Sequence, residues 1–311
     1  MKTIVTITMN PAIDKSSSVQ NVVAEKKLYC KPPRFEPGGG GVNISRAIKK
    51  LGGESMLLYP AGGLTGEKLT ELLNEEGLVH RSFPIEGIIR ESLVVLEEST
   101  DQQYRFGMPG PELQPKEWEQ FLVHLSVTKP GPDYLVASGS LPPGVPADFY
   151  AQLARAGKDR GAKVIVDTSG EALEKACREG VYMIKPNIGE FRKLAGKDIT
   201  EESQIKAEAG NMVDKGLFQV LVISLGAAGA LMVTKDSSLH IRPPAVPIIS
   251  KVGAGDSMVA GIVLHLARGK PLKESVIFGV ASGTAAVMTS GTQLCRKEDT
   301  ERLFETMISE N

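Results

Sequence analysis

The chain has 311 residues, a formal net charge of −1 and acidic and basic residues interspersed along its length, so nothing in its charge favours a nucleic-acid or membrane partner. Its three cysteines are widely spaced, which argues against a disulfide framework or a structural zinc site and suits a reducing cytosol. The length suits one α/β domain over residues 1–311, and neither a membrane span nor a signal peptide is recognisable, so we expect a cytoplasmic location.

The first predicted strand covers residues 4–9 and stops at Asn10-Pro11. Asp14 follows a few residues later. A carboxylate just past the carboxyl end of a strand lies where open α/β sheets bind ligands, but an Asx turn explains Asp14 equally well. Residues 15–36 are polar and only weakly alternating, so we expect them at the periphery.

Four consecutive glycines, Gly38 to Gly41, precede a predicted helix. Ile44, Ala47, Ile48 and Leu51 fall on one face of that helix. Ordering four glycines costs conformational entropy that a simple turn does not require. A loop that approaches a ligand is therefore favoured over a flexible turn.

A predicted hairpin with a polar turn at 99–102 carries Arg90 and Arg105. Counting from that turn places Arg105 opposite Leu96, so the two arginines are not cross-strand partners. They would meet on one ligand only if the hairpin bends. A solvated strand charge is the ordinary alternative for each of them.

From residue 133 onward, predicted strands alternate with predicted helices. This alternation implies right-handed βαβ crossovers and a mostly parallel sheet. Nearly every strand ends in polar residues or glycine, which predicts one continuous ligand-binding edge. The strands cover 134–137, 164–166, 182–184 and 220–223, and the helices lie near 147–160 and 202–215.

Gly253-Ala254-Gly255-Asp256 opens a further helix, whose apolar face carries Val259, Ile262, Val263 and Leu266. Glycines let the backbone approach a ligand closely, and the free amides at a helix N-terminus attract an anion. The negative charge of Asp256 would discourage a resident phosphate. Asp256 is therefore either the N-cap of the helix or a base beside a phosphoryl group in transfer.

Two glycine loops, an acid in an anion hole and basic residues on a hairpin together favour phosphoryl transfer from a nucleotide. A Walker-type site is excluded because the chain lacks Gly-x-x-x-x-Gly-Lys-Ser/Thr. A nicotinamide dehydrogenase would need Gly-x-Gly-x-x-Gly after the first strand, which is also missing. The histidines have neither metal-ligand spacing nor a triad context.

Four motifs, in this order and over essentially the whole chain, resemble those of the PfkB (ribokinase-like) sugar kinases. The resemblance implies a three-layer α/β/α fold with a mostly parallel sheet and a small β-sheet lid formed by about 15–36 and 86–107. It also implies a homodimer that pairs through the lids. The motifs are Gly38-Gly39-Gly40-Gly41-Val42-Asn43, Lys185-Pro186-Asn187-Ile188-Gly189-Glu190, Ser224-Leu225-Gly226 and Gly253-Ala254-Gly255-Asp256.

Two further segments, 10–14 and 138–144, resemble the branch of this family that phosphorylates sugar phosphates. Gly40 favours the 6-phosphofructokinase type, since 1-phosphofructokinases and tagatose-6-phosphate kinases commonly carry lysine there. The implied reaction is ATP-dependent phosphorylation of the 1-hydroxyl of fructose 6-phosphate to fructose 1,6-bisphosphate, a glycolytic step. Tagatose 6-phosphate and fructose 1-phosphate are the alternative substrates. A non-catalytic sugar-phosphate sensor is the alternative of a different class.

The resemblance implies that Asp256 takes the proton from the acceptor hydroxyl and that the amides of Gly253, Ala254 and Gly255 hold the transferring phosphoryl group. The residues implied to contact the sugar and the phosphate it already carries are Asp14, Lys27, Gly38, Gly39, Gly40, Gly41, Asn43, Arg90, Arg105 and Ser138. Those implied to hold ATP are Lys185, Asn187, Ser224, Gly226 and Gly229.

Two metal ions are also implied. Asn187 and Glu190 would organise Mg²⁺ through water. A monovalent cation such as K⁺ usually lies near the Gly-Ala-Gly-Asp motif in this family, whereas Lys251 adds a positive charge here that opposes it. Its carbonyl ligands would come from Ser250, Val252, Ala286 and Gly291.

Overall fold

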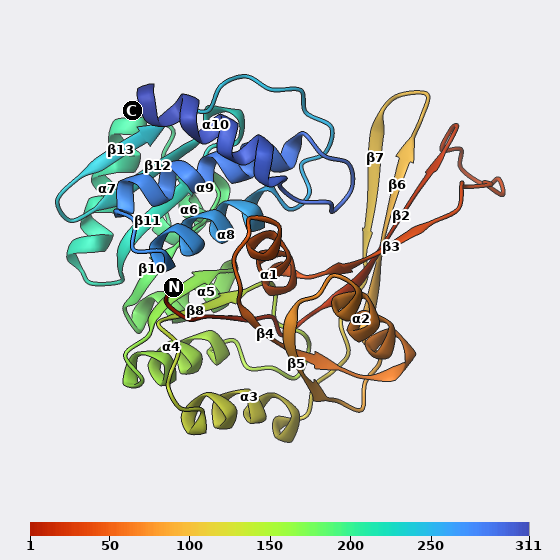
Figure 1. Ribbon diagram of the computed structural model, residues 1–311, viewed down its shortest axis with the longest axis horizontal. Coiled ribbons are helices and arrows are strands. Elements are labelled where there is room, and N and C mark those ends of the chain that lie inside the picture. The colour runs from red at the N-terminus through yellow and green to blue at the C-terminus, as the bar shows by residue number, and fades with distance from the viewer. Residues whose placement is uncertain (311) are drawn as a thin grey trace.

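The computed structural model describes residues 1–310 and shows a nine-stranded sheet with helices on both faces (Figure 1). The strand order is β13-β12-β11-β10-β9-β8-β1-β4-β5. An antiparallel pair, β12 (Ala230–Thr234) and β13 (Ser238–Ile241), forms one edge. The parallel strands are β1 (Ile4–Ile7), β4 (Met56–Ala61), β5 (Val79–Pro84), β8 (Tyr134–Ser138), β9 (Lys163–Asp167), β10 (Val181–Ile184) and β11 (Phe218–Ser224).

Two hydrophobic cores lie on opposite faces of this sheet, because successive strand residues point to opposite sides. Tyr134 and Val136 belong to one core, and Leu135 and Ala137 belong to the other. The predicted three-layer arrangement is confirmed. The helices of the first layer are α1 (Gly40–Lys50), α8 (Ala254–Ala267), α9 (Leu272–Val287) and α10 (Lys297–Glu310); those of the second are α3 (Pro115–Val127), α4 (Phe149–Asp159), α5 (Gly170–Arg178), α6 (Ile188–Ala195) and α7 (Glu202–Asp214).

Helix α8 is enclosed on every side beyond its first turn. Every residue from Ser257 to Ala267 is buried, since the helix packs against the sheet, α1 and α9. An apolar helix of this kind is a core helix rather than an amphipathic surface helix. Its N-terminus is therefore held at a fixed position above the sheet.

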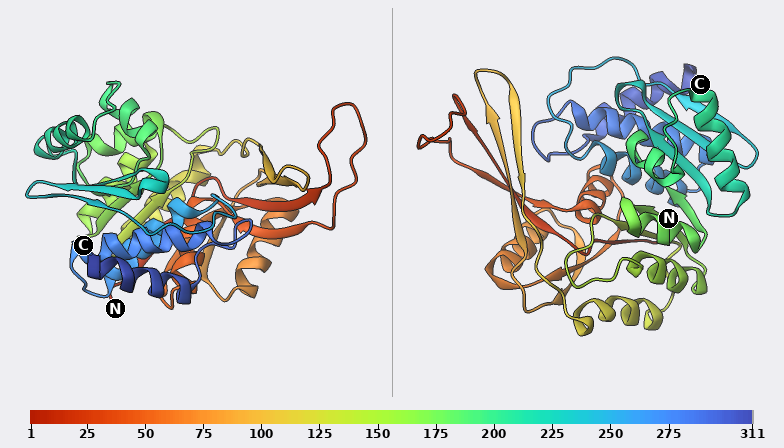
Figure 2. Two further views of the ribbon diagram at one scale, coloured as in Figure 1. Left: turned by 90° about the horizontal axis from the view of Figure 1, so that it is seen from above. Right: turned by 180° about the vertical axis from the view of Figure 1, so that it is seen from behind.

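A second, four-stranded sheet projects away from the large sheet (Figures 1 and 2). Its strand order is β3-β2-β6-β7. Asp14 lies inside β2, so the alternative of an Asx turn at Asp14 is wrong. The strands are β2 (Ala12–Val19), β3 (Arg34–Gly38), β6 (Arg90–Glu97) and β7 (Gln102–Gly107).

The hairpin register differs by two residues from the predicted one. Arg105 lies opposite Val94, not Leu96, because the connecting turn occupies residues 98–101 and Glu97 pairs with Gln102. Asp101 adopts a positive φ of 55° in that turn. The conclusion that Arg90 and Arg105 are not cross-strand partners is confirmed.

Helix α2 (Gly63–Glu75) joins the base of the small sheet to the large one. Leu69 and Leu73 of this helix share a buried cluster with Ile13 of β2 and Tyr59 of β4. Among residues 1–310, no helix is both long enough and apolar enough to cross a membrane.

Candidate active site

The residues singled out by their motifs meet where the carboxyl ends of the central parallel strands face the N-termini of α1 and α8 (Figure 1). Asn43 in the first turn of α1 donates a hydrogen bond from Nδ2 to Oδ2 of Asp256, in the first turn of α8, at 2.9 Å. The two glycine loops therefore converge on one carboxylate. Asn43 is buried, and its Oδ1 accepts no hydrogen bond within the described residues. Such an oxygen suits a bound hydroxyl.

The N-terminus of α8 has the geometry of an anion site. Its N-cap is Gly253, so the interpretation of Asp256 as an N-cap is wrong. Gly253 has a φ of 74°, and a Cβ there would lie 2.4 Å from Cδ2 of Leu294, so only glycine fits. No side chain caps the helix, which leaves the first-turn amides, including those of Ala254 and Gly255, open to a ligand.

The surroundings of Asp256 suit a base. Burial raises the pKa of Asp256 to about 6, and the neighbouring Asp167 carboxylate acts in the same direction. The hydrogen bond from Asn43 and the charge of Lys185 offset part of this rise. A carboxyl with this pKa is ionised at neutral pH and can still accept a proton readily.

Lys185 lies beneath the anion site at the end of β10. Its Nζ is 3.3 Å from Oδ1 of Asp167, and a Cβ on Gly255 would lie 3.2 Å from the same nitrogen. Burial alone would lower the pKa of Lys185, but the carboxylates of Asp167 and Asp256 outweigh burial and raise it. The ammonium group therefore stays charged directly under the helix N-terminus.

The glycine loop before α1 lies against the end of β8. A Cβ on Gly40 would lie 2.3 Å from Oγ of Ser138, which is buried. Any side chain at Gly40 would have to displace this hydroxyl. Of the other glycines in the loop, Gly38 ends β3, Gly39 is the N-cap of α1, and Gly41 lies in its first turn.

Asp14 faces four charged side chains. Burial raises the pKa of Asp14 to about 6, while Arg46, Arg90 and Arg105 lower it and Glu36 raises it. Asp14 pairs with Ser92 of β6, so residues two positions away on β6, Arg90 and Val94, lie on the same face of the sheet as Asp14. Arg105 of β7 lies opposite Val94 and therefore shares that face. The small sheet thus presents two arginines beside one carboxylate, an arrangement that the predicted register allowed only if the hairpin bends.

Arg90 is anchored at the base of the small sheet. It donates from Nη2 to the backbone oxygen of Asn10 at 3.2 Å and from Nη1 to that of Met108 at 3.3 Å, while its buried Nε has no partner in the described residues.

Lys27 is placed differently. It lies in the exposed loop between β2 and β3, which forms the outer end of the small sheet, and its Nζ is 5.2 Å from the ring centroid of Tyr29 (Figure 2). One copy of the chain therefore does not bring Lys27 to Asp14.

The residues implied to hold a nucleotide lie at the neighbouring strand ends. Asn187 and Ser224 form a parallel bridge that joins the ends of β10 and β11. Gly226 opens a short 3₁₀ helix (Gly226–Ala228), and Gly229 ends it. Asn187 also caps α6, since its Oδ1 accepts from the Glu190 backbone at 2.9 Å and its own N–H donates to Glu190 Oε2 at 2.8 Å.

The residues implied to hold Mg²⁺ and those implied to hold K⁺ differ in how well their oxygen atoms are free to bind an ion. Glu190 uses Oε2 in the α6 cap, which leaves Oε1 for a metal-bound water. Ser250 and Gly291 do meet, since Ser250 Oγ donates to the Gly291 carbonyl at 3.3 Å. The Ala286 carbonyl already accepts from Thr289 Oγ1 at 2.9 Å, and Lys251 is exposed. Among residues 1–310 no three His, Cys, Asp or Glu side chains cluster as a direct metal site.

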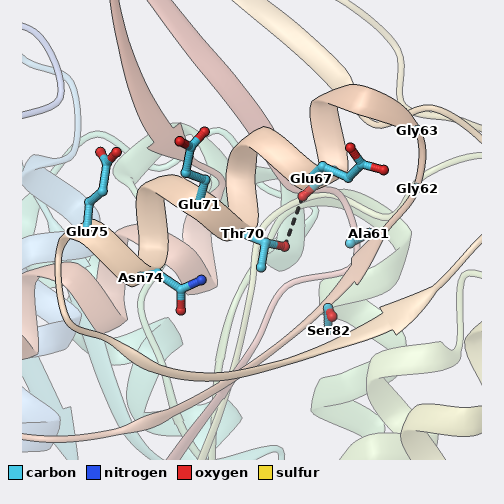
Figure 3. Close-up of a pocket in the computed structure, with 10 residues that line it drawn as sticks. Ala61, Gly62, Gly63, Glu67, Thr70, Glu71, Asn74, Glu75 and Ser82 are labelled. Atoms are coloured by element: carbon cyan, nitrogen blue, oxygen red, sulfur yellow. Dashed lines mark hydrogen bonds between the residues drawn. The ribbon is translucent and has the colours of Figure 1, made fainter.

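A separate open groove lies along α2 (Figure 3). It has a volume of about 780 Å³ and is lined by Glu67, Glu71 and Glu75. Three carboxylates would repel a phosphorylated ligand. None of the residues that line this groove belongs to the site described above.

Three residues of the site were not expected from the sequence. Asp167 ends a predicted strand, and its position there was the available signal. Thr8 and Asn10 follow β1, and each has a buried side-chain oxygen without a partner in the described chain. Asn10 also donates from Nδ2 to Oγ of Ser140 at 3.1 Å. Only the convergence of β1 with the 138–140 loop shows that these groups face the site.

The sequence of the chain also matches a known family. A family model described as "pfkB family carbohydrate kinase" matches residues 3–299. The ATP-dependent 6-phosphofructokinase isozyme 2 of Mycobacterium tuberculosis (strain H37Rv) is 43% identical over 302 residues, which cover 97% of this chain and 89% of the relative. The Escherichia coli (strain K12) protein of the same name is 40% identical over 305 residues, or 98% of each chain.

Solved structures agree with this match. Phosphofructokinase-2 from E. coli has been determined in complex with potassium, in complex with fructose-6-phosphate and as a tetrameric inhibited form. These structures align with TM-scores of 0.95, 0.94 and 0.93, at 39% identity, over 99% of this chain and 100% of theirs. Proteins named 1-phosphofructokinase and tagatose-6-phosphate kinase match at lower identity, 31% for Bacillus subtilis and 28% for Staphylococcus epidermidis.

Proposed function

Because the chain belongs to the pfkB family of carbohydrate kinases, we propose that it uses ATP to phosphorylate the 1-hydroxyl of fructose 6-phosphate, giving fructose 1,6-bisphosphate. The observation that carries this proposal is the hydrogen bond from Asn43 to Asp256. This bond joins the glycine loop at the start of α1, which would contact the sugar, to the base and the anion site at the start of α8, which would contact the transferring phosphoryl group. Glycolysis is the corresponding metabolic role.

Asp256 acts as the general base. Its Oδ2 is held by Asn43, so its Oδ1 accepts the proton of the attacking hydroxyl. The amides of Gly253, Ala254 and Gly255 stabilise the charge that develops on the transferring phosphoryl group. The charged Nζ of Lys185, held by Asp167 beneath Gly255, adds positive potential at the same place.

The sugar phosphate occupies the space between the small sheet and the α1 loop. Asp14, Ser138, Asn43 and the glycines from 38 to 41 contact its hydroxyls. Arg90 and Arg105 bind its phosphate, since guanidinium groups match phosphate geometry. Lys27 reaches that phosphate only if its loop folds inward or belongs to a second copy of the chain.

ATP lies along the ends of β10 and β11. Lys185, Asn187, Ser224, Gly226 and Gly229 hold it there. When bound, Mg²⁺ would neutralise charge on the phosphates, and Asn187 and Glu190 would hold it through water. A K⁺ ion near Ser250, Val252, Ala286 and Gly291 is supported by the meeting of Ser250 with Gly291 and opposed by Lys251.

The deciding experiment is a coupled ADP-release assay with fructose 6-phosphate, tagatose 6-phosphate and fructose 1-phosphate, with and without K⁺. We expect kcat/KM to be highest for fructose 6-phosphate. A higher value for either of the other sugars would transfer the assignment to that sugar. If no ADP is released with any of the three sugars, the sugar-phosphate sensor would be favoured instead.

The homodimer through the small sheet is supported by its exposed apolar residues, among them Tyr29, Phe35 and Phe106. Light scattering after gel filtration tests it. We expect a dimer, and replacement of Phe106 by Glu should give a monomer. A monomer in the unaltered chain would contradict this assembly.

A further inference from the structure

Arg46 is among the largest completely buried side chains, at 2% exposure, and lies in α1 three residues after Asn43. Its Nε and Nη2 donate to the carboxylate of Glu76, the C-cap of α2, at 2.7 to 3.0 Å. Its Nη1 donates to the carbonyl oxygens of Pro37 in β3, at 2.9 Å, and of Thr292, at 3.1 Å. One guanidinium therefore joins α1 to α2, to the small sheet and to the segment that precedes α10.

Glu36 of β3 completes this network. Its Oε1 is 3.6 Å from Nη2 of Arg46, and its Oε2 accepts from Oγ1 of Thr292 at 2.9 Å. Glu36 is also paired with Asp14 across β2 and β3. The strand beside Asp14 is thus attached both to α1 and to the segment around Thr292.

The same segment supports the anion site. Gly291 accepts the hydrogen bond of Ser250, and the fully buried Leu294 occupies the space where a side chain at Gly253 would be. Residues 291–294 therefore contact the small sheet on one side and the N-cap of α8 on the other.

We propose that Arg46, Glu36 and Thr292 form a clamp that fixes β3 relative to the N-terminus of α8, and so sets the distance between the sugar and its base. The inference rests on the proposed function of Asp14 and Asp256. A misplacement of about 1 Å at a reacting centre can cost about 100-fold in rate. Stability alone is a weak reason to bury a guanidinium, because apolar side chains often replace buried ion pairs without loss. Arg46 acts through its neighbours and is a positioning residue.

Thr292→Val tests the clamp with the smallest change, since it removes only the hydroxyl that bonds Glu36. We expect kcat/KM for fructose 6-phosphate to fall about tenfold, the value of one hydrogen bond to a charged group. Hydrogen exchange should accelerate in peptides that cover 34–38 and 253–257. Thr292→Ser keeps the hydroxyl, so its kcat/KM and its hydrogen exchange should match those of the unaltered chain.

Arg46→Lys keeps the charge but cannot make the forked contacts, so kcat/KM should fall about 100-fold. Its effect should be less than additive with Thr292→Val, because both act on one network. Arg268→Lys is the matched control. Arg268 donates from Nη2 to the carbonyls of Leu51 and Gly52 at the other end of α1, both at 3.2 Å.

The proposal is overturned if Thr292→Val leaves both kcat/KM and exchange at 34–38 unchanged. It is also overturned if Arg268→Lys lowers kcat/KM as much as Arg46→Lys. If the unaltered chain releases no ADP with any sugar phosphate, the proposed function fails, whereas the exchange measurement still decides whether the clamp exists.

Discussion

Two half-buried carboxyls, Asp14 and Asp256, dominate the site at the scale of single residues. Burial raises the pKa of each to about 6. Arg46 most strongly opposes this rise at Asp14, and Asn43 does so at Asp256. Each group is therefore ionised at neutral pH at some cost to the folded state, which is a common condition of catalytic carboxyls.

Asp256→Asn should stabilise the folded chain above about pH 6 and change its stability little near pH 4. The pKa of Asp256 is higher than its ordinary 3.8, so the folded state binds more protons and loses stability as pH rises through about 6. The gain at pH 7.5 should be on the order of 2 kcal/mol, discounted for partial solvent access. Urea unfolding at the two pH values measures it.

Asp133→Asn is the control for this measurement. Hydrogen bonds from Thr3 lower the pKa of Asp133, so its contribution is present at neutral pH and lost as pH falls. This variant should therefore lose stability at pH 7.5. A loss of stability at that pH in Asp256→Asn as well would contradict the account of Asp256.

Gly40→Ala should lower kcat/KM by at least tenfold and destabilise the chain by about 1 to 3 kcal/mol, because its Cβ would lie 2.3 Å from Oγ of Ser138. Steady-state kinetics and thermal unfolding check both effects. Gly210→Ala in α7 is the control. A Cβ there meets nothing within 4 Å, so it should leave kinetics unchanged and slightly raise stability.

At the scale of elements, the N-terminus of α6 combines a structural and a proposed metal role in Glu190. Glu190→Gln should keep the cap, since an amide oxygen can still accept from Asn187, but it removes the charge. We expect the Mg²⁺ concentration for half-maximal rate to rise about tenfold, the effect of losing one outer-shell partner, with unfolding unchanged.

Glu190→Ala should lose about 1 kcal/mol of stability in addition, because it also removes the cap. Titration of the rate with Mg²⁺ separates the two variants from the unaltered chain. The same Mg²⁺ requirement in all three would rule out the metal role of Glu190.

The hairpin of β6 and β7 carries the proposed phosphate contacts. Arg105→Ala should raise KM for fructose 6-phosphate about 10- to 100-fold with a smaller change in kcat, because it contacts a phosphate remote from the reacting hydroxyl. Arg81→Ala is the control. Arg81 is exposed on β5, at the edge of the large sheet, with its Cζ 5.4 Å from the ring centroid of Phe83. An equal rise in KM for both variants would contradict this assignment.

At the scale of the whole molecule, the layers follow from local sequence because strand and helix periods are local properties. Val136 and Ile165 face one core while their apolar strand neighbours face the other, and the glycines at 38–41 and 253–255 begin their helices as expected. The antiparallel edge pair of β12 and β13 was not expected, since its turn carries no distinctive signal.

The remaining features depend on contacts between distant segments. Arg46 lies in the sequence of an ordinary helix, and only the packing of α2 and residues 291–294 around it shows that it is buried. Asp167 and Lys185 meet because β9 and β10 are neighbours in the sheet. The two-residue register error at Arg105 came from the position of one turn.

The account depends most on Asp256 as the base. The most direct test is kcat of Asp256→Asn with saturating ATP and fructose 6-phosphate, together with the affinity for the sugar. We predict that kcat falls about 100- to 10,000-fold, as expected for loss of a general base, while the dissociation constant of the sugar changes by less than about fivefold. A kcat within about threefold of the unaltered chain would contradict the account.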